Sequence, residues 1–157
     1  MHARRLSLHA FVTSRGARSI GVLAAGLAAG VVLFAAGAGV ASTPPASTVT
    51  VPTAAGQTVS STWTGTILAG ANPTSACAPV SSSLVDEHAV TVNVASGTYE
   101  SVDASFRFTI EWEDAANDEI LTVVDPEGEV VDSSDGGSNV ETVNANNLPA
   151  GTYKAVA

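Results

Sequence analysis

Three features of the 157-residue chain predict an all-β fold, an antiparallel sandwich or barrel. Apolar residues recur at every second position in several segments, as they do in strands that bury one face. These segments are short, and Gly, Pro, Asn and Asp, which favour turns, separate them. After residue 41, no window of ten or more residues shows the period of a helix.

The first 41 residues have the three parts of an export signal. The N-terminal end carries four arginines and no acidic residue, and Ile20 to Val40 follows without a charged side chain. The small residues Ala38 and Ala41 then offer two cleavage points. This order predicts a secretory signal peptide. The Arg4-Arg5 pair also suggests export by the twin-arginine route, although the neighbouring residues match that pattern only loosely.

A retained membrane anchor is the alternative interpretation of the same segment. About 20 apolar residues can span a bilayer. This stretch is mostly Ala and Gly, which gain less from lipid than Leu or Ile do, and no cation follows it as a stop signal. Under either hypothesis, residues 42–157 lie outside the cytoplasm.

Residues 42–56 form a segment dense in Ser, Thr and Pro. Such a composition favours extended backbone and buries little, so it predicts a linker ahead of a domain at 57–157. A first edge strand at Thr48–Val51 is the weaker alternative.

From Gln57 onward, the strands can be placed in order. Thr58 to Leu68 is rich in β-branched residues around Trp63. His88 to Val94 places three valines on one face, with Thr91 and Asn93 on the other. The clearest strand is Val102–Trp112, in which six apolar residues alternate with Asp103, Ser105, Arg107, Thr109 and Glu111. A one-residue slip would expose every aromatic side chain of that strand, so its register is well specified.

The C-terminal third continues the same pattern. Strands are predicted at 119–124 and 129–132, joined by the turn Asp125-Pro126-Glu127-Gly128. Proline presets φ for the second turn position and glycine suits the fourth. The acidic, glycine-rich loop 133–139 leads to a strand at 140–143, and a turn at 146–150 leads to the last strand at 151–156.

The charge of the domain argues against nucleic acid as a partner. Residues 42–157 contain 2 cations and 15 acidic residues, so their formal charge is −13. Affinity for a phosphate backbone comes largely from cations that displace counterions. The composition therefore predicts a partner other than nucleic acid.

Several of these segments resemble the bacterial pre-peptidase C-terminal domain, a jelly-roll β-sandwich related in shape to CUB domains. The resemblance covers roughly residues 84–157. It rests on the segment 106–112, on 118–128 with its Asp-Pro-x-Gly turn, and on Asn147-Leu148-Pro149-Ala150-Gly151-Thr152-Tyr153. It implies a jelly-roll sandwich that acts as a non-catalytic appendage of a secreted hydrolase. Such appendages serve secretion or attachment, and some bind calcium.

Two observations suggest a chain that continues past Ala157. In the family, the strand that begins Gly-Thr-Tyr runs on and a further strand usually follows, whereas here the last strand is expected to be cut short. Cys77 is the only cysteine of an exported chain, so a disulfide partner is expected downstream. A buried free thiol and an intermolecular bridge are the alternatives for Cys77.

Calcium is the one cofactor that the sequence suggests. The ion takes six to eight oxygen ligands, often from several carboxylates, and loops at one end of a sandwich converge. Acidic residues crowd two successive loops, although their spacing does not match an EF-hand. The candidates are Asp114, Asp118, Glu119, Asp125, Asp132 and Asp135. The alternative is a solvated acidic surface.

Catalysis by this domain is not expected. His88 is the only histidine after the leader, and we expect it to be a partly exposed strand residue rather than a base or a zinc ligand. No Gly-x-Ser-x-Gly motif occurs. Glu111 and Glu113 share one strand face, a spacing common on any acidic strand.

The aromatic residues suggest a second kind of site. Trp63, Tyr99, Trp112 and Tyr153 could form a platform for sugars. Trp112 is in phase with Phe106 and Phe108, which predicts core packing, whereas Trp63 and Tyr99 are expected to be freer.

The sequence thus predicts a secreted, non-catalytic binding module, with calcium as its candidate structural ion. Its expected partner is an extracellular polymer, a protein surface or a downstream catalytic domain. The alternative is the N-terminal part of a larger secreted peptidase or glycosidase.

Overall fold

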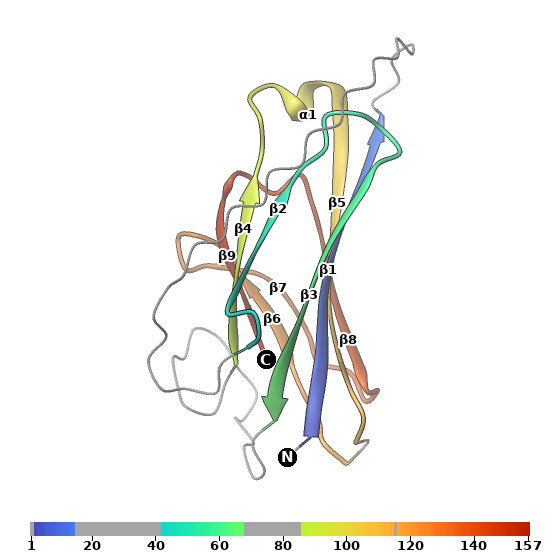
Figure 1. Ribbon diagram of the computed structural model, residues 1–157, viewed down its shortest axis with the longest axis vertical. Helices are drawn as coiled ribbons and strands as arrows, with labels where there is room; N and C mark the ends of the chain where they lie inside the picture. Colours follow the sequence, from blue (N-terminus) through green and yellow to red (C-terminus); the bar gives the residue numbers. More distant parts are fainter. Residues whose placement is uncertain (1, 15–41, 68–85, 115) are drawn as a thin grey trace.

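Two β-sheets packed face to face form the protein (Figure 1). The computed structural model describes residues 2–14, 42–67, 86–114 and 116–157. Within these ranges there are nine strands and one helical turn, α1 (Thr98–Ser101). The all-β sandwich predicted from the sequence is confirmed.

The first sheet has the order β3-β1-β5-β8, and all its neighbouring strands are antiparallel. These strands are β3 (Thr58–Ile67), β1 (His2–Ser14), β5 (Val102–Trp112) and β8 (Val140–Asn146). The second sheet has the order β2-β4-β9-β6-β7. Its strands are β2 (Ala46–Thr50), β4 (Glu87–Asn93), β9 (Gly151–Val156), β6 (Leu121–Val124) and β7 (Val130–Ser134).

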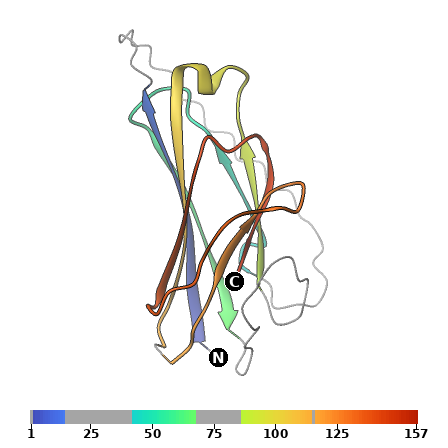
Figure 2. The same cartoon turned by 180° about the vertical axis from the view of Figure 1, so that it is seen from behind.

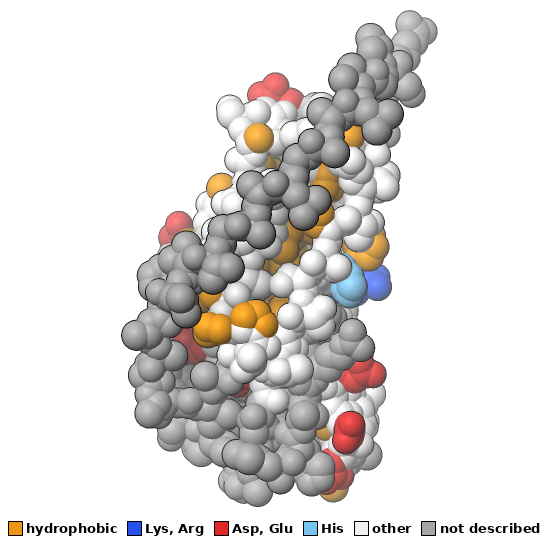
Figure 3. Space-filling view, viewed as in Figure 1, with side chains coloured by type: hydrophobic (Ala, Val, Ile, Leu, Met, Phe, Trp, Pro, Cys, Tyr) orange, Lys and Arg blue, Asp and Glu red, His pale blue; other side chains and the backbone are white. Residues whose placement is uncertain are grey.

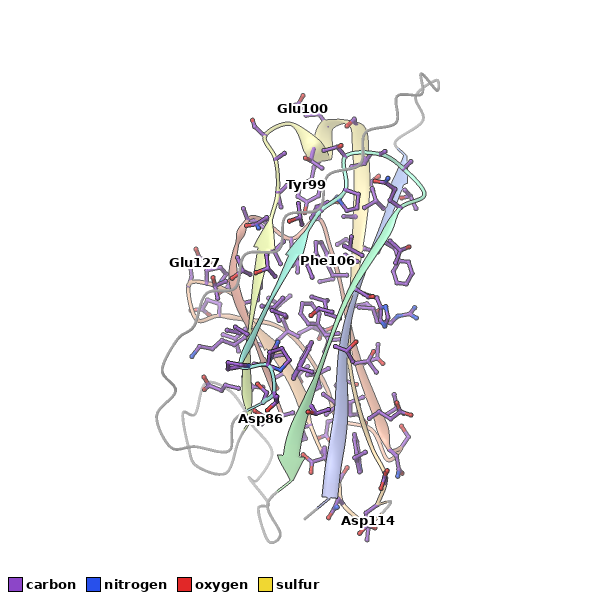
Figure 4. All side chains as sticks on the ribbon, in the orientation of Figure 1. Asp86, Tyr99, Glu100, Phe106, Asp114 and Glu127 are labelled. Carbon is purple, nitrogen blue, oxygen red and sulfur yellow. The ribbon has the colours of Figure 1, made fainter. Side chains whose placement is uncertain are left out.

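The core lies between the two sheets and follows the predicted alternation. In β5 every second residue is buried, including Phe106, which points between the layers (Figure 4), and Trp112. β4 contributes Val90 and Val92 from the second sheet, and β9 contributes Tyr153. Burial of these aromatic and branched side chains is the main stabilising contribution of such a sandwich.

The turn between β6 and β7 is the one that its sequence predicted. The amide of Gly128 donates to the carbonyl of Asp125 at 3.1 Å, and Gly128 has φ = 91°. The Asp125 carboxylate accepts the amides of Glu127 and Glu129 at 3.0 and 2.8 Å. The register of the pair shifts between Val123 and Val124, as at a β-bulge.

The Ser/Thr/Pro-rich segment is part of the sandwich, which corrects its interpretation as a linker only. β2 pairs with β4 in parallel, and Val49 and Val51 are buried in the core. Thr43 exchanges backbone hydrogen bonds with Thr64 at the edge of the first sheet. The segment therefore crosses from one sheet to the other, and its two valines are buried although polar and exposed residues dominate its composition.

The basic N-terminal segment, predicted to belong to a cleaved leader, forms strand β1. It lies between β3 and β5 in both views of the chain (Figures 1 and 2). Its residues Leu8, Ala10 and Val12 are buried in the core. Cleavage of the leader is a question of processing and stays a prediction. The strand is a finding that the interpretation as a leader missed, although Leu8, Ala10 and Val12 alternate with His9, Phe11 and Thr13.

The described part of the chain contains no helix long and apolar enough to cross a membrane. The apolar stretch Ile20 to Val40, on which the anchor hypothesis rests, lies outside the described residues, and so does Cys77.

Candidate functional site

A histidine is buried at the inner face of β4. The His88 side chain has no exposed surface, which corrects the expectation of a partly exposed residue. Its ring stacks on the Trp63 indole with 3.8 Å between the centroids and an angle of 8° between the planes. His88 is in phase with Val90 and Val92, and that alternation is the signal that could have predicted its burial.

Two serine hydroxyls occupy both nitrogens of the His88 ring. Ser42 Oγ lies 2.9 Å from Nδ1, and Ser47 Oγ lies 2.9 Å from Nε2. A neutral imidazole donates from one nitrogen and accepts at the other, so a pair of hydroxyls satisfies both. The edge pairing at Thr43 and the pairing of β2 with β4 bring these serines to His88.

Burial holds this imidazole neutral. Desolvation lowers the pKa of His88 from 6.5 to about 4, outweighing an opposing hydrogen bond to the Pro44 backbone. A serine hydroxyl beside a neutral imidazole is the arrangement of a nucleophile and its base. Ser42, however, is only 3% exposed, so a substrate could reach neither group without movement of the chain. The His88 cluster, meaning Ser42, Ser47, Trp63 and His88, ties β2, β3 and β4 together.

The six calcium candidates do not converge. Asp114 lies at one end of the sandwich, whereas Glu127, in the turn next to Asp125, lies far from it (Figure 4). The register of β6 and β7 pairs Leu121 with Ser134, so Asp118, Glu119 and Asp135 flank the opposite end of that hairpin from the turn. Acidic side chains are scattered over the face shown in Figure 3. In the described ranges, no three His, Cys, Asp or Glu side chains form a group that could hold a metal ion.

Three of the candidates bind nearby backbone amides instead. Asp125 caps the β6–β7 turn, Asp114 Oδ1 accepts the amide of Ala116 at 3.0 Å, and Asp132 Oδ1 accepts that of Ser133 at 2.9 Å. Such local hydrogen bonds stabilise turns and loop ends. Calcium binding stays a prediction, and these geometries give it no assembled site.

Glu141 is a buried carboxylate that the sequence analysis did not single out. It is 2% exposed and accepts hydrogen bonds from the Ser134 hydroxyl and from the amide of Gly136 at 2.8 Å. A buried carboxylate needs such donors to offset its desolvation. Glu141 therefore fixes the loop that joins β7 to β8.

Two tyrosines hold the loop that carries the Asn-Leu-Pro-Ala-Gly-Thr-Tyr motif. Tyr99 donates to the carbonyl of Leu148 at 2.6 Å, and Tyr153 donates to that of Pro149 at 3.0 Å. Burial raises the pKa of Tyr99 to about 12, so its hydroxyl stays a donor. Asn147 has φ = 49°, and its side chain bonds to the Ala104 amide and the Asp103 carboxylate.

A shallow open hollow of about 500 Å³ lies beside this loop. It is lined by residues 94–100, which include the first three residues of α1, and by Pro149 and Ala150. Tyr99 is half-buried at this place (Figure 4). Of the other proposed platform residues, Trp63 is buried against His88, Tyr153 is buried, and Trp112 is buried as predicted, with Nε1 donating to the carbonyl of Asn117. The four aromatic side chains therefore do not form an exposed platform.

The outer face of the first sheet is rich in hydroxyl and amide groups. Ser105 donates to Asn146 at 2.9 Å, Arg107 to Asn144 at 3.3 Å, and Thr109 pairs with Thr142 at 3.3 Å. On the far side of β1, the outward residues of β3 include Ser60, Thr62 and Thr64, which are exposed. We call this surface, made of the outward residues of β3, β5 and β8, the polar face. Its β5 residues are those that the sequence alternation placed outward.

No family model matches this chain, and no match was found among curated proteins or among solved structures. The resemblance to the pre-peptidase C-terminal domain therefore rests on its short motifs.

Proposed function

We propose that this chain is an exported, non-catalytic β-sandwich module that attaches to an extracellular polymer through the polar face. The pairs Ser105–Asn146, Arg107–Asn144 and Thr109–Thr142 carry this proposal because they form a regular row on adjacent strands. Strands lie about 4.8 Å apart, and outward residues recur about every 6.8 Å along each strand. Such a lattice of donors and acceptors suits an extended polymer with repeating hydroxyl or amide groups.

The burial of His88 and Ser42 supports a non-catalytic role, although Ser47 is only half-buried. The hydroxyls of Ser42 and Ser47 lie within hydrogen-bond distance of the imidazole, so they already occupy both of its ring nitrogens. A base that cannot be reached cannot take a proton from a substrate. We expect a serine-reactive fluorophosphonate probe to leave the folded protein unlabelled, and labelling at Ser42 or Ser47 would contradict this part of the proposal.

A sedimentation assay tests the attachment. The purified full chain is mixed with suspended cellulose, chitin or peptidoglycan, and the protein left in solution is measured. We expect one of these polymers to retain the protein. Arg107→Ala combined with Asn144→Ala should weaken retention by about 30-fold, since two hydrogen bonds of about 1 kcal/mol each are lost.

The matched control lies on the outer face of the second sheet. Thr91 and Thr152 form a comparable cross-strand pair there at 3.3 Å, and replacing both by Ala should leave retention unchanged. Retention by none of the polymers, or equal losses in the two double variants, would reject the polar face as the binding surface.

Export is tested by the N-terminal sequence and intact mass of the protein recovered from the culture medium. A chain that begins at Gly39 or Ser42 supports the leader prediction, and a chain that begins at Met1 or His2 contradicts it.

A further inference from the structure

Strand β1 fills a space between two strands that run in the same direction. It is antiparallel to β3 over ten register positions and to β5 over eleven. β3 and β5 are therefore parallel to each other and stand one strand apart. The two facing edges define a slot, which we call the β3–β5 slot, whose geometry requires one antiparallel strand.

The slot contributes strongly to the sandwich. Among the described strands, β1 is the only one that pairs with β3, which otherwise keeps its isolated bridge to Thr43. β3 carries Trp63, the partner of His88. An empty slot would leave two rows of backbone donors and acceptors without partners and would uncover Phe106 and Phe108 of the core.

The inward side chains of β3 and β5 set the size of the side chain that fits at each position of the slot. Ala10, the smallest buried residue of β1, stands in register with Phe106 and Val59. Val12 stands opposite Ala104, and Leu8 between Ser61 and Phe108. Phe106 therefore faces the small Ala10, and Ala104 faces the larger Val12, as close packing requires. Leu8 stands beside Phe108, with the small Ser61 on its other side.

The outward side chains of β1 are less constrained by their surroundings than the inward ones. Phe11 is 39% exposed, stacks on His9 and lies under the Arg107 guanidinium, whose carbon is 5.9 Å from the ring centroid. Thr13 is exposed. Recognition in the slot thus comes from backbone hydrogen bonds and from the inward side chains, which is how a sheet accepts an added strand.

We propose that the β3–β5 slot is a binding site for an extended segment of a separate polypeptide and that β1 is its intramolecular occupant. The fitting segment is about ten residues long, runs antiparallel to β5, and carries small or branched aliphatic side chains at alternate positions. Removal of residues 1–41, which rests on the proposed export, is the event that would open the slot. The slot itself does not depend on export or on the polar face.

Strand exchange in the full chain tests the proposal. A recognition sequence for a specific protease is inserted between residues 28 and 29, and the folded protein is cut there. A fluorescent peptide with the sequence of residues 2–14 is then added, and its uptake is followed by anisotropy and by native mass spectrometry. We expect one peptide for each cut chain and no uptake by the uncut chain, whose slot is filled.

Variant peptides separate slot binding from general stickiness. Ala10→Asp places a carboxylate against Phe106 and should weaken uptake by at least about 100-fold, because a buried unpaired charge is very costly. Phe11→Asp introduces the same carboxylate at an exposed position near Arg107, and this peptide should bind with an affinity within about tenfold of the parent peptide's. A peptide with Thr at both His9 and Phe11 should also bind within about tenfold, which would show that other sequences with the same inward pattern fit.

Three outcomes would overturn the proposal. One is equal binding of the Ala10→Asp and Phe11→Asp peptides, and another is uptake by the uncut chain. If the cut chain keeps its own strand, it is unfolded in urea and refolded with the peptide in excess. The third outcome is that the refolded cut chain does not incorporate the peptide, under conditions in which the uncut chain regains its native circular dichroism. Polymer retention is measured separately, so failure of the slot leaves the proposed attachment standing.

Discussion

The buried imidazole of His88 predicts how the stability of the protein depends on pH. In the folded chain its pKa is lowered to about 4, whereas the unfolded chain returns it to 6.5. Between these values the unfolded state binds the proton and the folded state does not. The stability associated with the neutral ring is therefore complete above pH 6.5 and is lost as the pH falls toward 4.

The size of this loss follows from the two pKa values. Their difference of about 2.5 corresponds to about 3 kcal/mol at low pH, and the linkage relation gives about 2 kcal/mol at pH 5. This is a large share of the stability of a small domain, which is about 5–15 kcal/mol.

The assay is urea unfolding at pH 8 and pH 5 for the wild type and for His88→Gln. The variant loses the ring that stacks on Trp63, so it should be less stable at both pH values. The decisive quantity is the drop in unfolding free energy between the two pH values, which we expect to be about 2 kcal/mol smaller in the variant. The carboxylates are common to both proteins and cancel in this comparison.

His9→Gln is the matched control, because His9 is half-buried on β1 and stacks on Phe11 rather than in the core. This variant leaves the His88 cluster intact, so a drop as small as that of His88→Gln would show that the pH effect does not arise at His88. Equal drops in wild type and His88→Gln, or an NMR titration of His88 with a midpoint near 6.5, would refute the argument that burial holds the ring neutral.

Two further predictions concern the C-terminal loop. Gly151→Ala should lower the free energy of unfolding by about 1–3 kcal/mol in a urea titration, because an added Cβ would clash with Cγ of Pro126. Gly137→Ala, whose added Cβ would have nothing within 4 Å, should stay within about 0.5 kcal/mol of the wild type. Equal effects of the two substitutions would contradict the clash. Asn147→Ala should lower the free energy of unfolding, measured by thermal unfolding, by about 2–3 kcal/mol, because it removes two side-chain hydrogen bonds at a residue with positive φ. Asn146→Ala, on the exposed face, should lower it by less than about 1 kcal/mol. The reverse order of the two effects would show that Asn147 does not hold the loop.

The proposed sites were only partly foreseeable from the sequence. The β5 part of the polar face could be predicted, because outward residues such as Arg107 and Thr109 alternate with apolar ones. Its partners on β8, such as Asn144, depend on a register set by pairing far along the chain. The calcium hypothesis used closeness in sequence, but Asp125 and Asp114 lie toward different ends of β6, which no local pattern reports.

The sequence by itself determined the all-β class, the buried face of β5, the turn at Asp125–Gly128 and the limits of β9. Each of these is a local property, in which the period of apolar residues or the φ preference of Pro and Gly acts over a few neighbours. Only the tertiary structure decided that the basic N-terminal segment is a central strand and that Trp63 turns inward against His88. It also brought Ser42 and Ser47 to His88 from 46 and 41 residues away. Strand pairing joins segments through backbone groups that every residue carries, so the choice of partner is fixed by packing across the core rather than by the sequence of either strand alone.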